Sequence, residues 1–276
     1  MTDWIGKYCI INGNLKPVED IPGHPYISER SVYEVLRVEN RVPLFIEDHF
    51  TRLQNSFSLC NKRFQMSLAD FRKTVLKLFN KNQISEGAVK FIFPDGDNKQ
   101  GFIAYFMTPH RPSAEEYKLG IKTIAIYEER NNPNAKIWNN QLREMATRLI
   151  KKNDAYEAIL IDKDNYITEG SRSNIFFIKN DTVYTTPDDR ILPGITRKKV
   201  LEICFDKGIK TKMTMIPYGR INEYDSVFLT GTSRKVVPVK SIDNHCFDTG
   251  NKLMRSIMSY FDELTAAYIL KNKHNE

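Results

Sequence analysis

The hydrophobic pattern of the first hundred residues alternates between short apolar runs and longer amphipathic stretches. Residues 31–39 are rich in β-branched and aromatic residues and predict a long strand, whereas the apolar residues within 46–60 recur at helical spacing. Ser67, with Asp70 three residues later, is typical of a capped helix start. The elements expected in this part are strands at 7–12, 15–18, 31–39, 88–93 and 101–107, a turn at Gly13-Asn14, and helices at 46–60 and 67–79.

A segment with two prolines and no periodicity, residues 108–116, separates this part from the rest of the chain. Beyond it we expect strands at 121–127, 156–162, 166–168, 174–178, 182–185, 227–230 and 236–239, and helices at 142–150, 196–207 and 253–270. The pattern predicts an α/β (α+β) fold of two domains, residues 1–112 and 120–276, joined by an interdomain linker at 113–119.

Composition excludes several classes of protein. The chain carries 41 Lys and Arg against 34 Asp and Glu, a formal charge of +7, but basic residues alternate with acidic ones, which favours acidic small molecules over nucleic acid as partners. No apolar run approaches the length of a membrane-spanning helix and no secretory signal is present, so we expect no membrane partner and a cytoplasmic location. The 4 cysteines and 5 histidines are scattered, which predicts neither a disulfide framework nor a metal site.

Four short pieces carry candidate chemistry for holding an anionic, heteroaromatic cofactor. Residues 192–197, Leu-Pro-Gly-Ile-Thr-Arg, lead a turn into a helix start, where backbone N–H groups and the helix dipole favour a phosphate. Residues 230–233, Thr-Gly-Thr-Ser, offer hydroxyls and N–H groups after a strand. Residues 168–174 form a Gly- and Ser-containing loop that carries Glu169, and Lys136 stands just before an amphipathic helix. Taken singly, each piece is more often an ordinary turn or a surface lysine than part of a cofactor site.

Together with three further pieces, they resemble the fold-type IV (class IV) aminotransferases, which use pyridoxal 5′-phosphate (PLP). The resemblance covers nearly the whole chain and rests on seven pieces in the family's order. They are 31–38 (SVYEVLRV), 47–53 (EDHFTRL), Ala135-Lys136 with Asn139, 156–160 (YEAIL), 168–177 (TEGSRSNIFF), 192–197 (LPGITR) and 230–233 (TGTS). The resemblance implies a small N-terminal α/β domain and a larger C-terminal pseudo-barrel domain.

The resemblance assigns three residues to the chemistry of the cofactor. Lys136 matches the lysine that forms a Schiff base with the cofactor aldehyde and then moves the α-proton of the substrate, a role that requires an amine able to lose its charge. Glu169 matches the carboxylate that faces the pyridine nitrogen and keeps it protonated. Arg52 matches the phosphate-binding arginine, whose planar fork suits a bidentate contact.

The resemblance assigns contacts with the cofactor or the substrate to four more residues. Ile195 and Thr196 through their backbone amides, and Thr232 through its hydroxyl or amide, are expected to complete the phosphate shell. Tyr33 matches a position that reaches the substrate. Members of the family build their sites at a subunit interface, so the resemblance also implies a homodimer.

The chain departs from the family's pattern on the substrate side. The Arg-x-His carboxylate trap of the D-amino acid aminotransferases is absent, and residues 93–96, Phe-Pro-Asp-Gly, stand in its place. Glu29-Arg30-Ser31 replaces the usual Gly-Asp-Gly, and Arg172 stands where a small residue is common. We expect Arg172 or Arg30 to pair with a substrate carboxylate, the alternative being a solvated surface arginine.

The sequence thus predicts a PLP-dependent aminotransferase that moves an amino group from an amino acid to a 2-oxo acid. The branched-chain type is the first choice, because Pro133-x-x-Lys136 and the missing trap resemble that group. Two alternatives stay open. One is a 4-amino-4-deoxychorismate lyase, which would eliminate pyruvate with the same lysine and cofactor. The other is a non-catalytic relative whose altered segments at 29–31 and 93–96 no longer form a substrate pocket.

Overall fold

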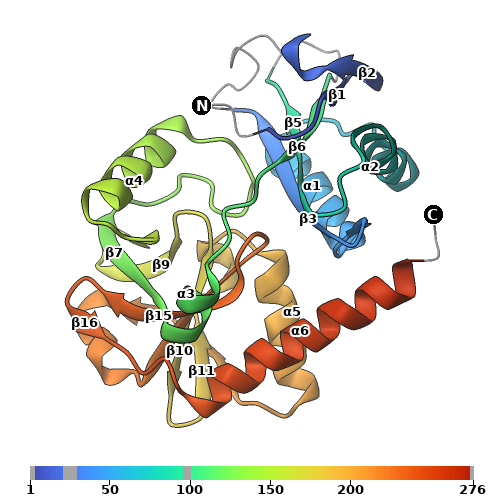
Figure 1. Ribbon diagram of the computed structural model, residues 1–276. Helices are drawn as coiled ribbons and strands as arrows, with labels where there is room; N and C mark the ends of the chain where they lie inside the picture. Colours follow the sequence, from blue (N-terminus) through green and yellow to red (C-terminus); the bar gives the residue numbers. More distant parts are fainter. Residues whose placement is uncertain (1–3, 21–29, 96–100, 274–276) are drawn as a thin grey trace. The chain divides into compact units, whose positions relative to one another are not determined.

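The computed structural model describes residues 4–20, 30–95 and 101–273 and divides the chain into two compact units (Figure 1). Unit 1 comprises Met1–His110, Ala135–Asn139 and Thr265–Glu276, and unit 2 comprises Arg111–Asn134 and Asn140–Leu264. The short segment that carries Lys136 therefore groups with unit 1, whereas the predicted division at 113–119 assigned it to the C-terminal domain.

Among the described residues of unit 1, six strands form an antiparallel sheet in the order β2-β1-β6-β5-β3-β4. The strands are β1 (Tyr8–Ile11), β2 (Asn14–Pro17), β3 (Val32–Glu39), β4 (Val42–Pro43), β5 (Gly87–Phe93) and β6 (Ile103–Met107). The first hairpin turns at Asn12-Gly13, one residue before the predicted Gly13-Asn14, since Asn14 already pairs with Ile11. Asn12 and Gly13 both take positive φ, 51° and 80°, which a two-residue hairpin turn requires and which Asn and Gly tolerate best.

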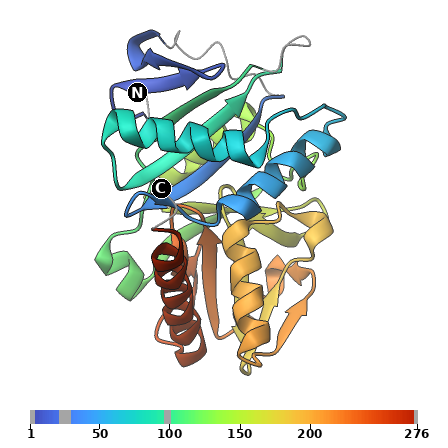
Figure 2. The same ribbon diagram turned by 90° about the vertical axis from the view of Figure 1, so that its right-hand side faces the viewer.

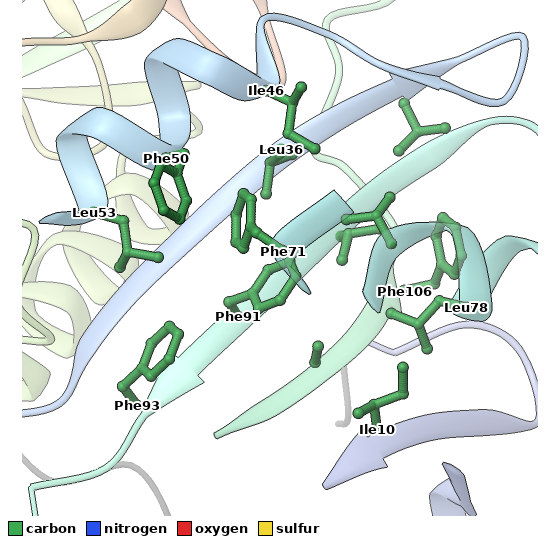
Figure 3. Close-up of a cluster of buried hydrophobic side chains, with 14 of the residues drawn as sticks. Ile10, Leu36, Ile46, Phe50, Leu53, Phe71, Leu78, Phe91, Phe93 and Phe106 are labelled. Carbon is green, nitrogen blue, oxygen red and sulfur yellow. The ribbon is translucent and has the colours of Figure 1, made fainter. Parts of the chain in front are cut away.

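Helices α1 (Ile46–Leu59) and α2 (Leu68–Asn82) cover one face of this sheet (Figure 2). Ser67 caps α2 by accepting the N–H of Asp70 at 3.1 Å, as the sequence predicts. Figure 3 shows the resulting core, in which side chains of both helices meet those of the strands. Its labelled members include Phe50 and Leu53 of α1 and Phe91 of β5. Removing these large apolar side chains from water stabilises the unit.

Among the described residues of unit 2, ten strands form a curled half-barrel in the order β12-β11-β10-β14-β15-β7-β8-β9-β13, with β16 paired to β15. The strands are β7 (Ile121–Tyr127), β8 (Glu157–Ile161), β9 (Tyr166–Gly170), β10 (Asn174–Lys179), β11 (Thr182–Thr185), β12 (Thr211–Met213), β13 (Ile216–Pro217), β14 (Ser226–Gly231), β15 (Lys235–Ile242) and β16 (His245–Cys246). A buried cluster that includes Ile159, Phe177, Leu229 and Val239 packs together across the strands. The predicted α/β fold with a larger pseudo-barrel unit is confirmed.

The remaining helices are α3 (Ala114–Leu119), α4 (Asn140–Lys152), α5 (Ile195–Asp206) and α6 (Lys252–Asn272), with short 3-10 turns at Val18–Asp20, Asp188–Arg190 and Tyr218–Glu223. The predicted linker at 113–119 contains α3 instead, because Ser113 and Glu116 cap its start reciprocally. Leu142 and Ala146 of α4 pack against β7 and β8. None of the helices in the described ranges is both long and apolar enough to cross a bilayer.

The core of unit 1 predicts a large difference between two Leu→Ala substitutions in helices. Leu78 of α2 is fully buried, whereas Leu270 of α6 is 70% exposed. We expect Leu78→Ala to lower the free energy of unfolding by about 2–5 kcal/mol, since it leaves a cavity, and Leu270→Ala to change it by less than about 0.5 kcal/mol. Urea titration measures both values, and equal losses would contradict the packing described.

Candidate active site

Lys136 lies on an irregular segment whose backbone is bonded to the start of β3 in unit 1. The N–H of Tyr33 donates to the carbonyl of Lys136 at 3.1 Å, and the N–H of Trp138 donates to the carbonyl of Ser31 at 2.8 Å. The N–H of Lys136 itself donates to the hydroxyl of Ser56 in α1 at 3.0 Å. Its Nζ lies 4.7 Å from the centroid of the Tyr33 ring, a cation–π contact. The backbone of Lys136 is thus fixed, and its amine lies against the Tyr33 ring.

A buried charge cluster in the same unit joins β3 to α1. The guanidinium of Arg52 donates two hydrogen bonds to the carboxylate of Glu34, from Nε to Oε2 at 3.0 Å and from Nη2 to Oε1 at 2.6 Å. Nδ1 of His49 lies 3.1 Å from Oε1 of Glu34. All three side chains are buried. The cluster holds Arg52 by its planar fork, which leaves the guanidinium little freedom to turn.

The pKa values of Glu34 and His49 are both lowered in this cluster. Burial opposes ionisation of Glu34, but Arg52 and His49 outweigh it and hold the pKa of that carboxyl well below its usual range. Burial lowers the pKa of His49 below 6.5, with Arg52 and Lys136 adding to the effect and Glu34 opposing it. Glu34 is therefore ionised and His49 neutral near pH 7.

A second lysine, Lys90 of β5, lies in an aromatic surround on the sheet of unit 1. It is 5% exposed, and its Nζ lies 4.5 Å from the ring centroid of Trp138 and 5.6 Å from that of Tyr105. Trp138 in turn makes an edge contact with Tyr33, with ring centroids 5.4 Å apart. The rings of Tyr33 and Trp138 therefore link the amines of Lys136 and Lys90 in one continuous set of contacts.

In unit 2, Glu169 at the end of β9 is held by donors from three directions. Its carboxylate accepts from Nε of Arg130 at 2.8 Å, from Nδ2 of Asn174 at 3.1 Å and from the N–H of Leu192 at 3.2 Å. Arg130 also donates to the carbonyl of Ser171 at 2.6 Å. Glu169 is only 3% exposed, and these donors fix the orientation of its carboxylate.

A polar cavity of about 400 Å³ opens beside this carboxylate within unit 2. Arg130 and Glu169 both line it, together with Thr168, Lys163 and Arg190. A small ligand or water in the cavity would therefore meet the Arg130–Glu169 ion pair directly.

The start of α5 satisfies the requirements of an anion site. Gly194 stands at the N-cap, and no side chain caps the helix. A Cβ at position 194 would collide with Oδ1 of Asn174, so only glycine fits between this helix start and the loop that carries Glu169. Ile195 and Thr196 form the first turn and are both buried, which places their backbone amides where a helix favours negative charge.

The strand end at 230–233 adds hydroxyls to the same unit. Thr230 is 1% exposed, and its hydroxyl has no hydrogen-bond partner among the described residues. Thr232 follows in a half-buried position. A buried hydroxyl without a partner and an uncapped helix start are both features that a bound phosphate would satisfy. The donors of unit 2 therefore fit the phosphate and ring of PLP.

The two arginines expected near the substrate lie on the surface. Arg172 donates to the hydroxyl of Thr147 in α4 at 2.8 Å, in an exposed position. Arg30 is exposed, and its carbonyl accepts from Lys62 at 3.0 Å. Lys62 also pairs with Asp95 of the segment that replaces the carboxylate trap, at 2.6 Å. Glu29 and Gly96 lie outside the described residues.

Sequence reasoning did not identify Glu34, His49, Lys90 or Arg130 as site residues. Glu34 and His49 lie inside two of the segments that carry the family resemblance. Glu34 directly follows Tyr33, and His49 precedes Arg52 by three residues. Their positions beside assigned residues were the signal that could have identified them. Lys90 and Arg130 stand in unmatched stretches and carried no signal of their own.

The lowered pKa of His49 predicts a pH-dependent loss of stability. The unfolded chain binds a proton near pH 6.5 that the native state does not, so this stability is fully present above that pH and is lost as the pH falls. Thermal unfolding between about pH 7.5 and 5.5 should show a smaller loss in His49→Gln than in wild type, by about 1 kcal/mol. His245→Gln, at an exposed position, should retain the wild-type slope. Identical slopes in wild type and His49→Gln would contradict a neutral buried His49.

Known proteins are similar to this chain in sequence. A model of the family described as amino-transferase class IV matches residues 31–242. The D-alanine aminotransferase of Bacillus licheniformis is 29% identical over 244 residues, which cover 84% of this chain and 85% of the relative. A probable branched-chain-amino-acid aminotransferase of Thermotoga maritima is 31% identical over 219 residues, 79% of each chain.

Solved structures share the fold. The branched-chain amino acid aminotransferase of Escherichia coli has a TM-score of 0.84 at 21% identity and covers 95% of both chains. The T.th. branched-chain amino acid aminotransferase, solved with pyridoxamine 5′-phosphate, has a TM-score of 0.86 at 20% identity and covers 96% of both chains. The match of the family over most of the chain, with this fold, assigns the protein: it is a member of the class IV aminotransferases.

Proposed function

We propose that this chain is a PLP-dependent aminotransferase that moves the amino group of an amino acid to a 2-oxo acid. The observation that carries the proposal is Lys136, a lysine fixed by backbone hydrogen bonds to β3 and set against the Tyr33 ring in unit 1. A lysine on a stiff backbone presents its amine in a reproducible position, as covalent chemistry at that amine requires.

The contacts to the cofactor that we propose come from the residues that the resemblance assigns. Lys136 would hold the aldehyde carbon and carry the substrate's α-proton at Nζ, and Glu169 would keep the pyridine nitrogen protonated. When bound, PLP supplies an electron sink for the carbanion left by that proton. The phosphate contacts that we propose come from Arg52, from the amides of Ile195 and Thr196, and from Thr232.

Three cations are candidates for a substrate carboxylate, and Lys90 has the best support. Its amine is buried among the rings of Trp138 and Tyr105, and Tyr33 links it to Lys136, whereas Arg172 and Arg30 are exposed. A desolvated ammonium binds a carboxylate more strongly than a solvated one does. We propose that Tyr33 contacts the substrate and that Lys90 pairs with a second carboxylate of a dicarboxylic partner.

The relatives named above are of two kinds, a D-alanine aminotransferase and branched-chain-amino-acid aminotransferases. The branched-chain type remains our first choice, and the D-alanine aminotransferase relative requires both enantiomers to be tested as donors. The proposal includes a homodimer, which the family resemblance implies, and a cytoplasmic location, which the sequence pattern favours.

An activity assay separates the proposed reaction from the lyase alternative. Donors of both enantiomers are incubated with 2-oxoglutarate, and glutamate formation and pyruvate release from 4-amino-4-deoxychorismate are measured in parallel. We expect glutamate formation with a branched-chain donor, and a loss of at least about 1000-fold in Lys136→Ala because no other group replaces the proton carrier. Lys151→Ala, at an exposed position in α4, should retain full activity. Pyruvate release without amino transfer would favour the lyase, and neither reaction would favour the non-catalytic relative.

The three cations are separated by their effects on KM. Lys90→Met should raise the KM for 2-oxoglutarate about tenfold and leave the KM for a monocarboxylic 2-oxo acid nearly unchanged, since only the second carboxylate loses its partner. The KM values of Arg172→Ala and Arg30→Ala are measured with the same two 2-oxo acids for comparison with Lys90→Met. An unchanged KM in Arg172→Ala removes Arg172 from the substrate site, and an unchanged KM in Lys90→Met removes Lys90.

A further inference from the structure

A second buried carboxylate, Glu157 at the start of β8, lies against the loop that follows Glu169. Glu157 is 1% exposed and accepts from the hydroxyls of Ser171 at 2.5 Å and Ser173 at 3.1 Å. It also forms an ion pair with Arg234, which is 4% exposed. Nothing in the proposed chemistry uses this carboxylate, so its burial needs a separate explanation.

The partners of Glu157 come from two segments that are distant in sequence. Ser171 and Ser173 belong to the tight turn between β9 and β10, directly after Glu169. Arg234 closes the turn after β14, in which Thr232 stands, and its N–H donates to the carbonyl of Gly231 at 3.2 Å. One buried carboxylate therefore joins the turn after Glu169 to the turn that contains Thr232.

Both turns are packed closely around this contact. The N–H of Gly170 donates to the carbonyl of Ser173 at 2.7 Å, and a Cβ at position 170 would collide with the Ser173 hydroxyl. A Cβ at Gly231 would lie 3.3 Å from Cγ of Arg234 and 3.5 Å from the carbonyl of Arg172. The turn that contains Gly231 therefore lies beside the turn that contains Arg172.

Arg234 is itself fixed on several sides. Its guanidinium lies 5.3 Å from the ring centroid of Tyr156, and its carbonyl accepts from the hydroxyl of Tyr117 at 2.9 Å. Burial opposes ionisation of Glu157, but Arg234 and the Ser171 hydroxyl outweigh it and hold its pKa below the usual range. Both members of the pair are charged and buried, so loss of one would leave the other as an unpaired buried charge.

We propose that Glu157 and Arg234 are positioning residues for the cofactor. Their ion pair sets the separation between the turn after Glu169 and the turn that carries Thr232, and so determines how tightly unit 2 holds PLP. This inference rests on the proposed function, because it assigns the pyridine nitrogen to Glu169 and part of the phosphate to Thr232.

The test compares the affinity for PLP with the stability of the cofactor-free protein. Wild type, Glu157→Gln, Arg234→Met and the double variant are titrated with PLP by absorbance, and their melting temperatures are measured without PLP. We expect each single variant to weaken PLP binding by about tenfold, because an unpaired buried charge displaces its turn. The double variant should lose less than the product of the two single losses, since both act through one contact.

Two further variants separate positioning from folding. Arg234→Lys keeps the charge and should recover most of the affinity lost in Arg234→Met. The double variant Ser171→Ala/Ser173→Ala leaves the ion pair intact and removes only the two hydroxyls that bond Glu157 to the turn between β9 and β10. This variant should fold even if Glu157→Gln does not, and it should bind PLP several-fold more weakly. Glu223→Gln, which removes the partner of Lys179 on the surface of unit 2, is the control and should bind PLP like wild type.

The outcomes are distinguishable from failure of the proposed function. If wild type binds PLP and every variant binds it with unchanged affinity, or if affinity falls only as far as the melting temperature of the cofactor-free protein predicts, the positioning role is wrong. If wild type does not bind PLP at all, the proposed function is wrong, and the cofactor role of the pair with it.

Discussion

The backbone pairing between β3 and the segment 135–139 is the interaction on which the account of this protein depends. Two hydrogen bonds, Tyr33 to Lys136 and Trp138 to Ser31, together with the bond from Lys136 to Ser56, hold the segment that carries Lys136 in unit 1. Before this segment, the side chain of Asn134 donates to two carbonyls of unit 2, at 2.6 and 2.8 Å. Segment 135–139 therefore follows an anchored residue and is itself held by backbone hydrogen bonds. These bonds fix the main chain at Lys136, and one of them depends on the side chain of Ser56.

Each unit also contains a buried carboxylate that organises its neighbours. Glu34 holds Arg52 and His49 in unit 1, and Glu157 holds Arg234 and two serines in unit 2. Buried ion pairs contribute little net stability, because desolvation offsets the Coulomb attraction. Their value here lies in geometry, because a charged pair with several hydrogen bonds has one arrangement that satisfies all of them. In both units, the fixed side chains stand next to residues assigned to the cofactor.

Much of the fold was predictable because it depends on local patterns. The helical spacing before Cys60 gave α1, and the Ser67 cap gave the start of α2. The capping box at Ser113 and Glu116 was present in the sequence, but two nearby prolines favoured a linker. The strands β12 and β13, of 3 and 2 residues, were not predicted, since so short a segment has no period to detect. They form only because longer strands beside them supply partners.

The site was predictable only where the motif itself was informative. Lys136 and Glu169 were assigned by resemblance. Lys136 is half-buried and Glu169 is buried, and the hydrogen bonds of both residues support those assignments without testing them. The pairs Glu34–Arg52 and Glu157–Arg234 span 18 and 77 residues, and no local rule joins residues so far apart. Lys90 shows the same limit, because its aromatic neighbours come from another strand and from the Lys136 segment.

The most direct test of the central claim is to identify the lysine that carries the cofactor. Purified protein loaded with PLP is reduced with borohydride, digested and examined by mass spectrometry. The account predicts a phosphopyridoxyl group on the peptide that contains Lys136 and on no other. Attachment to another lysine, or to none, would contradict it.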